Sequence, residues 1–278
     1  MLVRLVPPER IAAISRYSHD PAATSVPLAL ARRFRATAGT AEEVVAMRPD
    51  LVLASSFTPP ATRAAFERAG LRALYLDSPA TIAASRAQVE EVAAAVGAEE
   101  RGRALVAEID RAVAEYASPE KRTPSRNQAP PRRRPGPSHA AVAEESLPVA
   151  TAIVAGPRPP PGKEGIGADI RPKALVFIAG SLANGSGNLL DELLARAGLG
   201  NAAARYGLAY TGTLPAELIA RDPPDVVIAP DRGGRVGEMR RRLLPRTPFA
   251  AFPRELVNCG GPSIAPALAR LAAIRRSL

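Results

Sequence analysis

One sequence pattern occurs twice in this chain and restricts its possible folds more than any other feature. Residues Ala41–Ala54 read AEEVVAMRPDLVLA, and residues Ala216–Ala229 read AELIARDPPDVVIA. Each copy has a glutamate at the same distance before a Pro-Asp pair, so that Glu42 corresponds to Glu217. One copy alone is common in α/β proteins. Two copies with matching spacing indicate an internal duplication, and therefore two similar lobes.

Each copy predicts a short helix followed by a buried strand. A proline ends the helix, because it cannot continue the helical hydrogen bonding. The branched apolar runs Leu51–Leu53 and Val226–Ile228 are typical of strands buried on both faces of a parallel sheet. Polar or glycine-rich loops follow at Ser55–Pro60 and Pro230–Gly234. In open α/β sheets, ligands bind at loops in this position.

The rest of the chain alternates between strand and helix patterns, except in one segment. Ser118–Pro172 is rich in proline, arginine, glycine and serine, and we expect it to be a disordered insertion. Apolar spacing predicts a long helix over Thr81–Ala117, broken near Gly97 or continuous, that crosses between the lobes. The other predicted strands are Arg10–Ser15, Leu71–Leu76, Lys173–Ala179 and Glu255–Val257, and the other predicted helices are Pro60–Ala69, Leu189–Ala197, Val236–Leu244 and Ile264–Arg276.

Composition restricts function only weakly. The formal charge of +10 would favour nucleic acid or an anionic surface as a partner, but much of the excess lies in Arg122–Arg134 and Arg240–Arg242. The arginine tract PPRRRPGP has no interleaved aromatic residues on which bases could stack, so we expect no specific nucleic-acid binding. A single cysteine excludes an internal disulfide and a cysteine-cluster metal site.

No motif predicts a catalytic site or a resident metal. The loop Gly180–Asn188, GSLANGSGN, lies between a strand and a helix, but it lacks the lysine of a P-loop and does not fit GxGxxG. His19 beside Asp20 could act as a base or a metal pair, although two adjacent residues in a loop more often form a solvated turn. Cys259 has no assignable histidine partner. We therefore expect no enzymatic activity, with a nucleotide-using enzyme of the doubly wound class as one alternative.

Several segments together resemble one protein family. They are PERIAAISRYSHDP, GTAEEVVAMRPDLVLA, AGLRALYLDSP, KALVFIAGSLANGSGNLLDELLARAGLGNAAA, AELIARDPPDVVIA and NCGGPSIAPALARLA. These segments are similar to the substrate-binding proteins of ABC importers for cobalamin, haem and ferric siderophores, the helical-backbone periplasmic binding proteins. The resemblance covers both ends of the chain and leaves Ser118–Pro172 unaccounted for.

The resemblance implies an α/β fold with two Rossmann-like lobes bridged by a long helix. The implied divisions are an N-terminal lobe over 1–80, a bridging helix over 81–117, the insertion over 118–172 and a C-terminal lobe over 173–278. A ferric siderophore, haem or cobalamin would be bound between the lobes and delivered to a permease dimer with its ATPase, by a monomer with no cofactor of its own. Glu42 and Glu217 would dock on the permease. The implied ligand-binding residues are Arg16, Tyr17, Asp20, Ser56, Phe57, Asp77, Leu182, Asn184, Tyr206, Tyr210, Arg232 and Cys259.

Two departures from the family pattern accompany this expectation, namely the insertion over 118–172 and the start of the sequence. Family members begin with a signal peptide and then a first strand and helix, whereas this sequence shows neither ahead of RIAAIS. The N-terminal lobe is therefore expected to lack its first strand and helix, with Met1 internal to the gene or the product truncated. The resemblance still implies a periplasmic or extracytoplasmic location. A cytoplasmic anion-binding or interaction protein, favoured by the basic tract and the missing signal, is the second alternative.

Overall fold

The computed structural model describes residues 1–21, 24–116, 170–230, 234–257 and 260–278. All the described residues belong to one compact unit. The predicted insertion lies almost entirely outside the described residues. The predicted lobe boundary at residue 80 stays a prediction.

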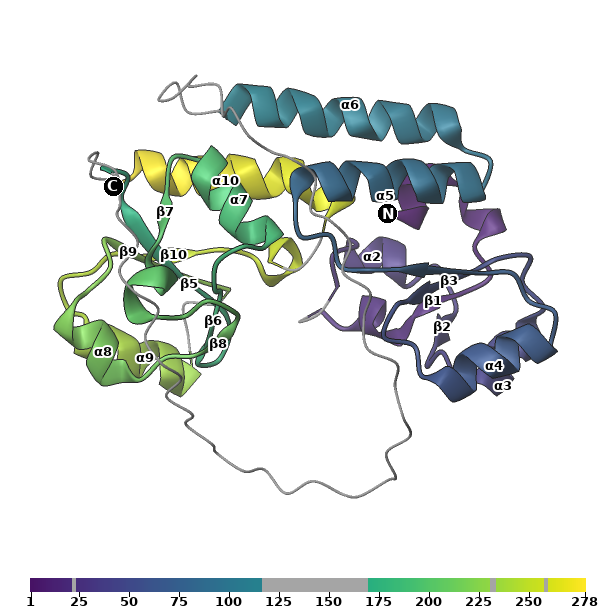
Figure 1. The fold of residues 1–278 in the computed structure, drawn as a ribbon, viewed down its shortest axis with the longest axis horizontal. Coiled ribbons are helices and arrows are strands. Elements are labelled where there is room, and N and C mark those ends of the chain that lie inside the picture. The colour runs from purple at the N-terminus through teal and green to yellow at the C-terminus, as the bar shows by residue number, and fades with distance from the viewer. Residues whose placement is uncertain (22–23, 117–169, 231–233, 258–259) are drawn as a thin grey trace, which may run out of the picture. The chain divides into compact units, whose positions relative to one another are not determined.

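The N-terminal part alternates short strands with helices, as the sequence predicts (Figure 1). Its four strands form two separate parallel pairs, β1 with β2 and β3 with β4. Its helices and strands are α1 (Leu2–Leu5), β1 (Ile14–Ser15), α2 (Leu28–Ala31), β2 (Ala36–Thr37), α3 (Ala41–Met47), β3 (Val52–Ser55), α4 (Pro60–Arg68), β4 (Ala73–Leu76), α5 (Ile82–Ala95) and α6 (Glu99–Tyr116).

The C-terminal part is built on one mixed sheet. The strand order is β10-β9-β5-β6-β8, with β7 also paired to β5. Strands β10, β9, β5 and β7 pair in parallel, whereas β6 pairs antiparallel with both β5 and β8. The elements are β5 (Lys173–Ala179), β6 (Leu182–Ala183), α7 (Leu189–Arg196), β7 (Gly200–Asn201), β8 (Gly212–Thr213), α8 (Ala216–Arg221), β9 (Val226–Ala229), α9 (Gly234–Leu243), β10 (Phe249–Ala251) and α10 (Ile264–Arg276).

Strand β9, from the second copy of the repeat, is buried on both faces. Val226 and Ile228 belong to one apolar cluster, and Val227 and Ala229 belong to another. Because side chains alternate along a strand, each face of β9 packs against a different layer. The prediction made for this run from its continuous apolar character is confirmed. The first copy differs, because β3 is only half-buried.

The predicted helix over 81–117 is broken near Gly97, which is one of the two forms that the sequence allows. Two helices, α5 and α6, pack against each other and are separated by a turn at Gly97, whose φ is +64°. A left-handed backbone of this kind favours glycine and ends α5. Helix α6 packs on both α1 and α10, so it contacts elements from each end of the chain.

Two further predictions were wrong in detail. Only Ile14–Ser15 of the expected strand 10–15 is a strand, since Pro8–Arg10 forms a 3₁₀ turn after Pro7. The expected last strand, 255–257, lies in another 3₁₀ turn over Arg254–Leu256. The last strand is instead Phe249–Ala251, which pairs with β9.

Specific hydrogen bonds join the N-terminal and C-terminal parts of the compact unit. The amide of Ile82, at the start of α5, donates to Glu192 Oε2 on α7 at 2.8 Å. The hydroxyl oxygen of Ser85, a fully buried side chain, accepts a hydrogen bond from the amide of Gly261 at 2.6 Å. These bonds fix α5 against the C-terminal elements, because a buried polar group left without a partner would be costly.

Candidate binding loops

Three aromatic side chains are largely exposed, and all three lie in loops that the sequence predicts to bind ligand. Tyr17 is 63% exposed, Phe57 is 83% exposed and Tyr210 is 84% exposed. Exposing an aromatic ring forfeits the free energy that its burial would provide. These rings therefore indicate a surface that another molecule covers.

The first loop follows β1 as a 3₁₀ turn over Arg16–His19. Ser15 Oγ accepts a hydrogen bond from the Tyr17 amide at 3.4 Å, and the Arg16 guanidinium carbon lies 5.5 Å from the Tyr17 ring centroid. Arg16, Tyr17 and Asp20 are all exposed. His19 Nε2, in contrast, is buried without a hydrogen-bond partner. The turn thus presents a cationic and an aromatic side chain together.

The second loop follows β3, and the Arg63 side chain stabilises its backbone. The Phe57 amide donates to Ser55 Oγ at 3.1 Å, and Arg63 donates to the carbonyl oxygens of Ser56 and of Thr58, the latter at 2.9 Å. The Arg63 guanidinium also stacks on the Tyr75 ring, at 4.2 Å from its centroid. Phe57 therefore projects from a loop whose backbone is well supported. Ser56 itself is half-buried.

Asp77 leads the loop that follows β4, and its side chain is exposed. The Gln88 side chain on α5 donates to the Asp77 carbonyl at 2.6 Å and anchors this loop to the helix. Strands β3 and β4 are parallel and in register, so the Ser56 and Asp77 loops leave the same edge of the pair. The structure therefore brings these two predicted loops together.

In the C-terminal part, an asparagine network supports the loop that carries Tyr210. Asn184 and Asn188 exchange side-chain hydrogen bonds at 3.1 and 3.2 Å, and the Asn201 amide donates to the Gly185 carbonyl at 2.9 Å. A Cβ at Gly185 would overlap the backbone of Tyr210, so the two loops touch directly. Asn184 is 4% exposed and its amide is used within the network. We therefore assign Asn184 a positioning role, and its direct contact with a ligand stays a prediction.

The loop before α7 does not have a free anion site. The Asp191 carboxylate accepts a hydrogen bond from the Gly187 amide at 2.9 Å, and Asn188 Oδ1 accepts one from the Asp191 amide at 3.1 Å. A phosphate at this helix start would meet the negative charge of Asp191, which already occupies the position that anions favour. This geometry disfavours the nucleotide-binding alternative.

The remaining predicted site residues differ in accessibility. The Tyr206 hydroxyl donates to the Asp222 carbonyl at 2.6 Å, and burial raises the pKa of Tyr206. Leu182 lies half-buried in β6. Arg232 and Cys259 lie outside the described residues, so their predicted roles stay predictions.

Glu42 and Glu217 occupy equivalent places in the two copies of the repeat. Each lies in the first turn of its helix, α3 or α8, and each is exposed. Acidic residues are favoured there by the helix dipole, so their position alone does not require a partner. Both carboxylates are nevertheless accessible to a partner.

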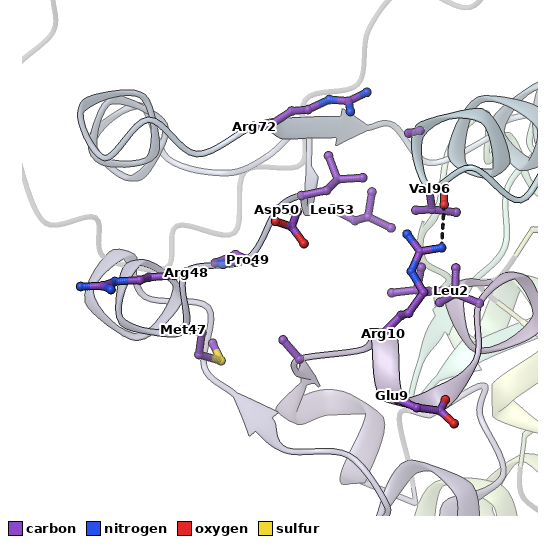
Figure 2. Close-up of a pocket in the computed structure, with 14 residues that line it drawn as sticks. Leu2, Glu9, Arg10, Met47, Arg48, Pro49, Asp50, Leu53, Arg72 and Val96 are labelled. Carbon is purple, nitrogen blue, oxygen red and sulfur yellow. Dashed lines mark hydrogen bonds between the residues drawn. The ribbon is translucent and has the colours of Figure 1, made fainter.

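The cavity in Figure 2, about 700 Å³ in volume, lies away from these loops. It adjoins the residues that precede β1, β3 and β4, the opposite end of those strands from the predicted loops. Figure 2 shows Arg10 directed at the Val96 carbonyl, to which it donates at 3.0 Å, with Arg48 and Arg72 on the other side. The described lining residues include none of the predicted ligand-binding residues.

Comparisons with known proteins agree with the predicted resemblance. The family model described as "Periplasmic binding protein" matches residues 2–130, in the N-terminal part of the chain. A sequence comparison with curated proteins gave no match.

Solved structures share the fold of this chain. Periplasmic heme-binding protein RhuT from Roseiflexus sp. RS-1 is 18% identical, with a TM-score of 0.67 over 99% of this chain and 94% of that one. Periplasmic heme-binding protein HutB of Vibrio cholerae is 14% identical, with a TM-score of 0.66 over 98% and 93% of the two chains. A periplasmic heme-binding protein from Pseudomonas aeruginosa is 18% identical, with a TM-score of 0.63 over 98% and 87%.

Sequence reasoning missed the residues that support the binding loops. Arg63 and Tyr75 were not predicted, and neither were Asn188 and Asn201. Tyr75 is notable because its hydroxyl is buried without a hydrogen-bond partner under the Arg63 guanidinium. The two asparagines of the loop Gly180–Asn188 were the sequence feature that could have indicated the hydrogen-bond network. The approach of Gly185 to Tyr210 depends on tertiary packing, which local patterns do not encode.

Proposed function

We propose that this chain is the substrate-binding component of an ABC importer. It captures a metal chelate on the loops that carry Tyr17, Phe57 and Tyr210 and delivers the ligand to a permease without covalent chemistry. The exposure of these three rings is the observation that carries the proposal, because each ring lies in a loop that the sequence independently predicts to bind ligand. The family match supports the transport role.

The chemistry of the loops supports a large ligand with flat apolar surface and anionic groups. The three aromatic rings provide apolar faces, and the Arg16 guanidinium beside Tyr17 suits a carboxylate. A haem, a ferric siderophore and a cobalamin all have some of these properties. Haem is the first ligand to test, because tyrosine can ligate haem iron and two of the exposed rings are tyrosines. Three structural neighbours are heme-binding proteins, which supports testing haem first.

The proposed partners are a permease dimer and its ATPase, with the chain acting as a monomer. Glu42 and Glu217 would each pair with a basic group on one half of the permease, since the two carboxylates lie in equivalent turns of repeated elements. The family match supports a periplasmic or other extracytoplasmic location. Within the described ranges, no helix is long and apolar enough to cross a membrane.

Thermal unfolding in the presence of haem, cobalamin and several ferric siderophores tests the proposal. A ligand at about 100 times its Kd adds roughly 2.7 kcal/mol to the free energy of unfolding, if it binds only the folded state. We expect one of these chelates to raise the Tm of the wild-type chain and to do so much less in Phe57→Ala and Tyr210→Ala.

The matched control is Met239→Ala, which also removes an exposed apolar side chain but lies on α9, outside the three loops that carry the exposed rings. It should keep the full ligand-dependent shift. A Tm that responds to no chelate, or that responds equally in the loop variants, would contradict the proposed function.

A further inference from the structure

Helix α9 carries a stripe of exposed apolar side chains that the proposed function does not use. Val236, Met239 and Leu243 are 42%, 54% and 43% exposed. Residues spaced by three and four positions lie on one face of a helix, so these three side chains form a continuous strip. We call Val236, Met239 and Leu243 the α9 stripe.

The α9 stripe is not needed to attach the helix to the protein, because arginines do that. The Arg240 guanidinium carbon lies 3.4 Å from the ring centroid of the buried Phe177, and Arg240 also donates to the Gly180 carbonyl. Arg241 lies over Phe249, at 5.7 Å from its ring centroid. Cations stacked on aromatic faces thus supplement the apolar contact that the buried Leu244 makes just after the helix. Arg240 and Arg241 face the sheet, whereas the α9 stripe faces outward.

The corresponding helix of the first repeat shows that the fold does not require this arrangement. Helix α4 follows β3 as α9 follows β9, and it buries Phe66, which is 2% exposed. None of the large apolar side chains found exposed in the described residues lies on α4. The exposure of the α9 stripe is therefore a particular property of the second copy.

Basic side chains accompany the stripe. Arg235 and Arg242 are exposed on α9, and Arg246 is exposed just beyond its end. Helix α8 packs beside α9 (Figure 1) and adds Leu218, a fourth large apolar side chain, which is 42% exposed. Apolar residues flanked by arginines on one helix are typical of segments that lie in the interface of an anionic bilayer.

We propose that the α9 stripe and its flanking arginines bind the surface of an anionic phospholipid membrane. The apolar side chains enter the region between the headgroups and the acyl chains, and Arg235 and Arg242 pair with lipid phosphates. The outward stripe provides the apolar contact, and the excess of arginine provides the charge complementarity. This surface would keep the protein near the membrane in which a permease lies, and it does not depend on the identity of the chelate.

Cosedimentation of the full chain with lipid vesicles tests this proposal. The probes are vesicles of phosphatidylcholine containing phosphatidylglycerol and vesicles of phosphatidylcholine alone. We expect binding to the anionic vesicles, weaker binding at high salt and little binding to the neutral ones. The triple variant Val236→Ser, Met239→Ser, Leu243→Ser should bind roughly tenfold or more weakly. The reason is that its side chains no longer transfer apolar surface from water into the bilayer.

A matched pair of charge variants separates a specific surface from general attraction. Arg235→Ser with Arg242→Ser should weaken vesicle binding, whereas Arg68→Ser with Arg72→Ser removes the same charge from the first copy and should not. Unchanged Tm values would show that each variant is folded. Equal binding by the triple variant, equal loss in both charge pairs, or no binding to the anionic vesicles would overturn the proposal.

Discussion

Tyr17, Phe57 and Tyr210 point outward because polar groups support the backbone beneath them. Arg63 donates to two carbonyl oxygens of the Phe57 loop, and the asparagine network packs Gly185 against Tyr210. A loop fixed by hydrogen bonds loses less conformational entropy when it binds a ligand. The aromatic residues could be predicted from loop position and type, but their supports could not, because the Arg63 hydrogen bonds and the approach of Gly185 to Tyr210 depend on tertiary packing.

Glu43 gives a testable pH dependence at the residue scale. A hydrogen bond from the Thr37 hydroxyl at 2.6 Å, and then one from the Ala38 amide at 2.8 Å, hold the pKa of Glu43 below its ordinary value of 4.5. A lowered pKa stabilises the folded state above that value, and the stability is lost as the pH falls through the folded pKa. Glu43→Gln should therefore lower the Tm near pH 7, and its difference from wild type should shrink in acid.

The measurement is Tm against pH for the wild-type chain and two variants. Glu42→Gln removes a charge one residue earlier and should keep the acid dependence of the wild type. If Glu43→Gln also kept that dependence, the hydrogen bonds from Thr37 and Ala38 would not lower the pKa of Glu43 in the protein in solution.

The elements that were predicted best are those whose local pattern is sufficient to define them. Helix α10 and strand β5 have the predicted bounds, because apolar periodicity and flanking breakers mark both ends. Strand β10 was missed, since the three residues FAA become a strand only by pairing with β9. The small strands β6 and β8 depend in the same way on partners elsewhere in the chain.

The pairing of α5 with α6 depends on Gly102. A Cβ at this position would overlap the Ala93 side chain, so the helices approach closely only because residue 102 is glycine. Gly102→Ala should destabilise the chain by about 1–3 kcal/mol in urea unfolding, through overpacking. If the helices were not in contact, the same change would instead stabilise α6 by about 1 kcal/mol through helix propensity. Arg103→Ala, at an exposed position in the same helix, is the control.

The whole molecule uses one repeated unit in two ways. The helix-strand-helix order recurs as α3, β3, α4 and as α8, β9, α9, with an exposed glutamate early in each first helix. The second copy lies in a larger sheet and exposes the α9 stripe, whereas the first lies in a two-stranded pair. Duplication and the order of elements could be read from the sequence. The number of strands in each sheet depends on long-range pairing and could not.

Hydrogen-deuterium exchange with and without bound chelate tests the central claim most directly. If the loops bind the ligand, backbone protection should rise together in segments 15–20, 55–58, 77–79 and 206–210, which come from both parts of the chain. Protection confined to segments 47–51 and 95–96, at the cavity in Figure 2, would contradict the proposed site. Unchanged exchange with haem, cobalamin and ferric siderophores would contradict the binding of these chelates.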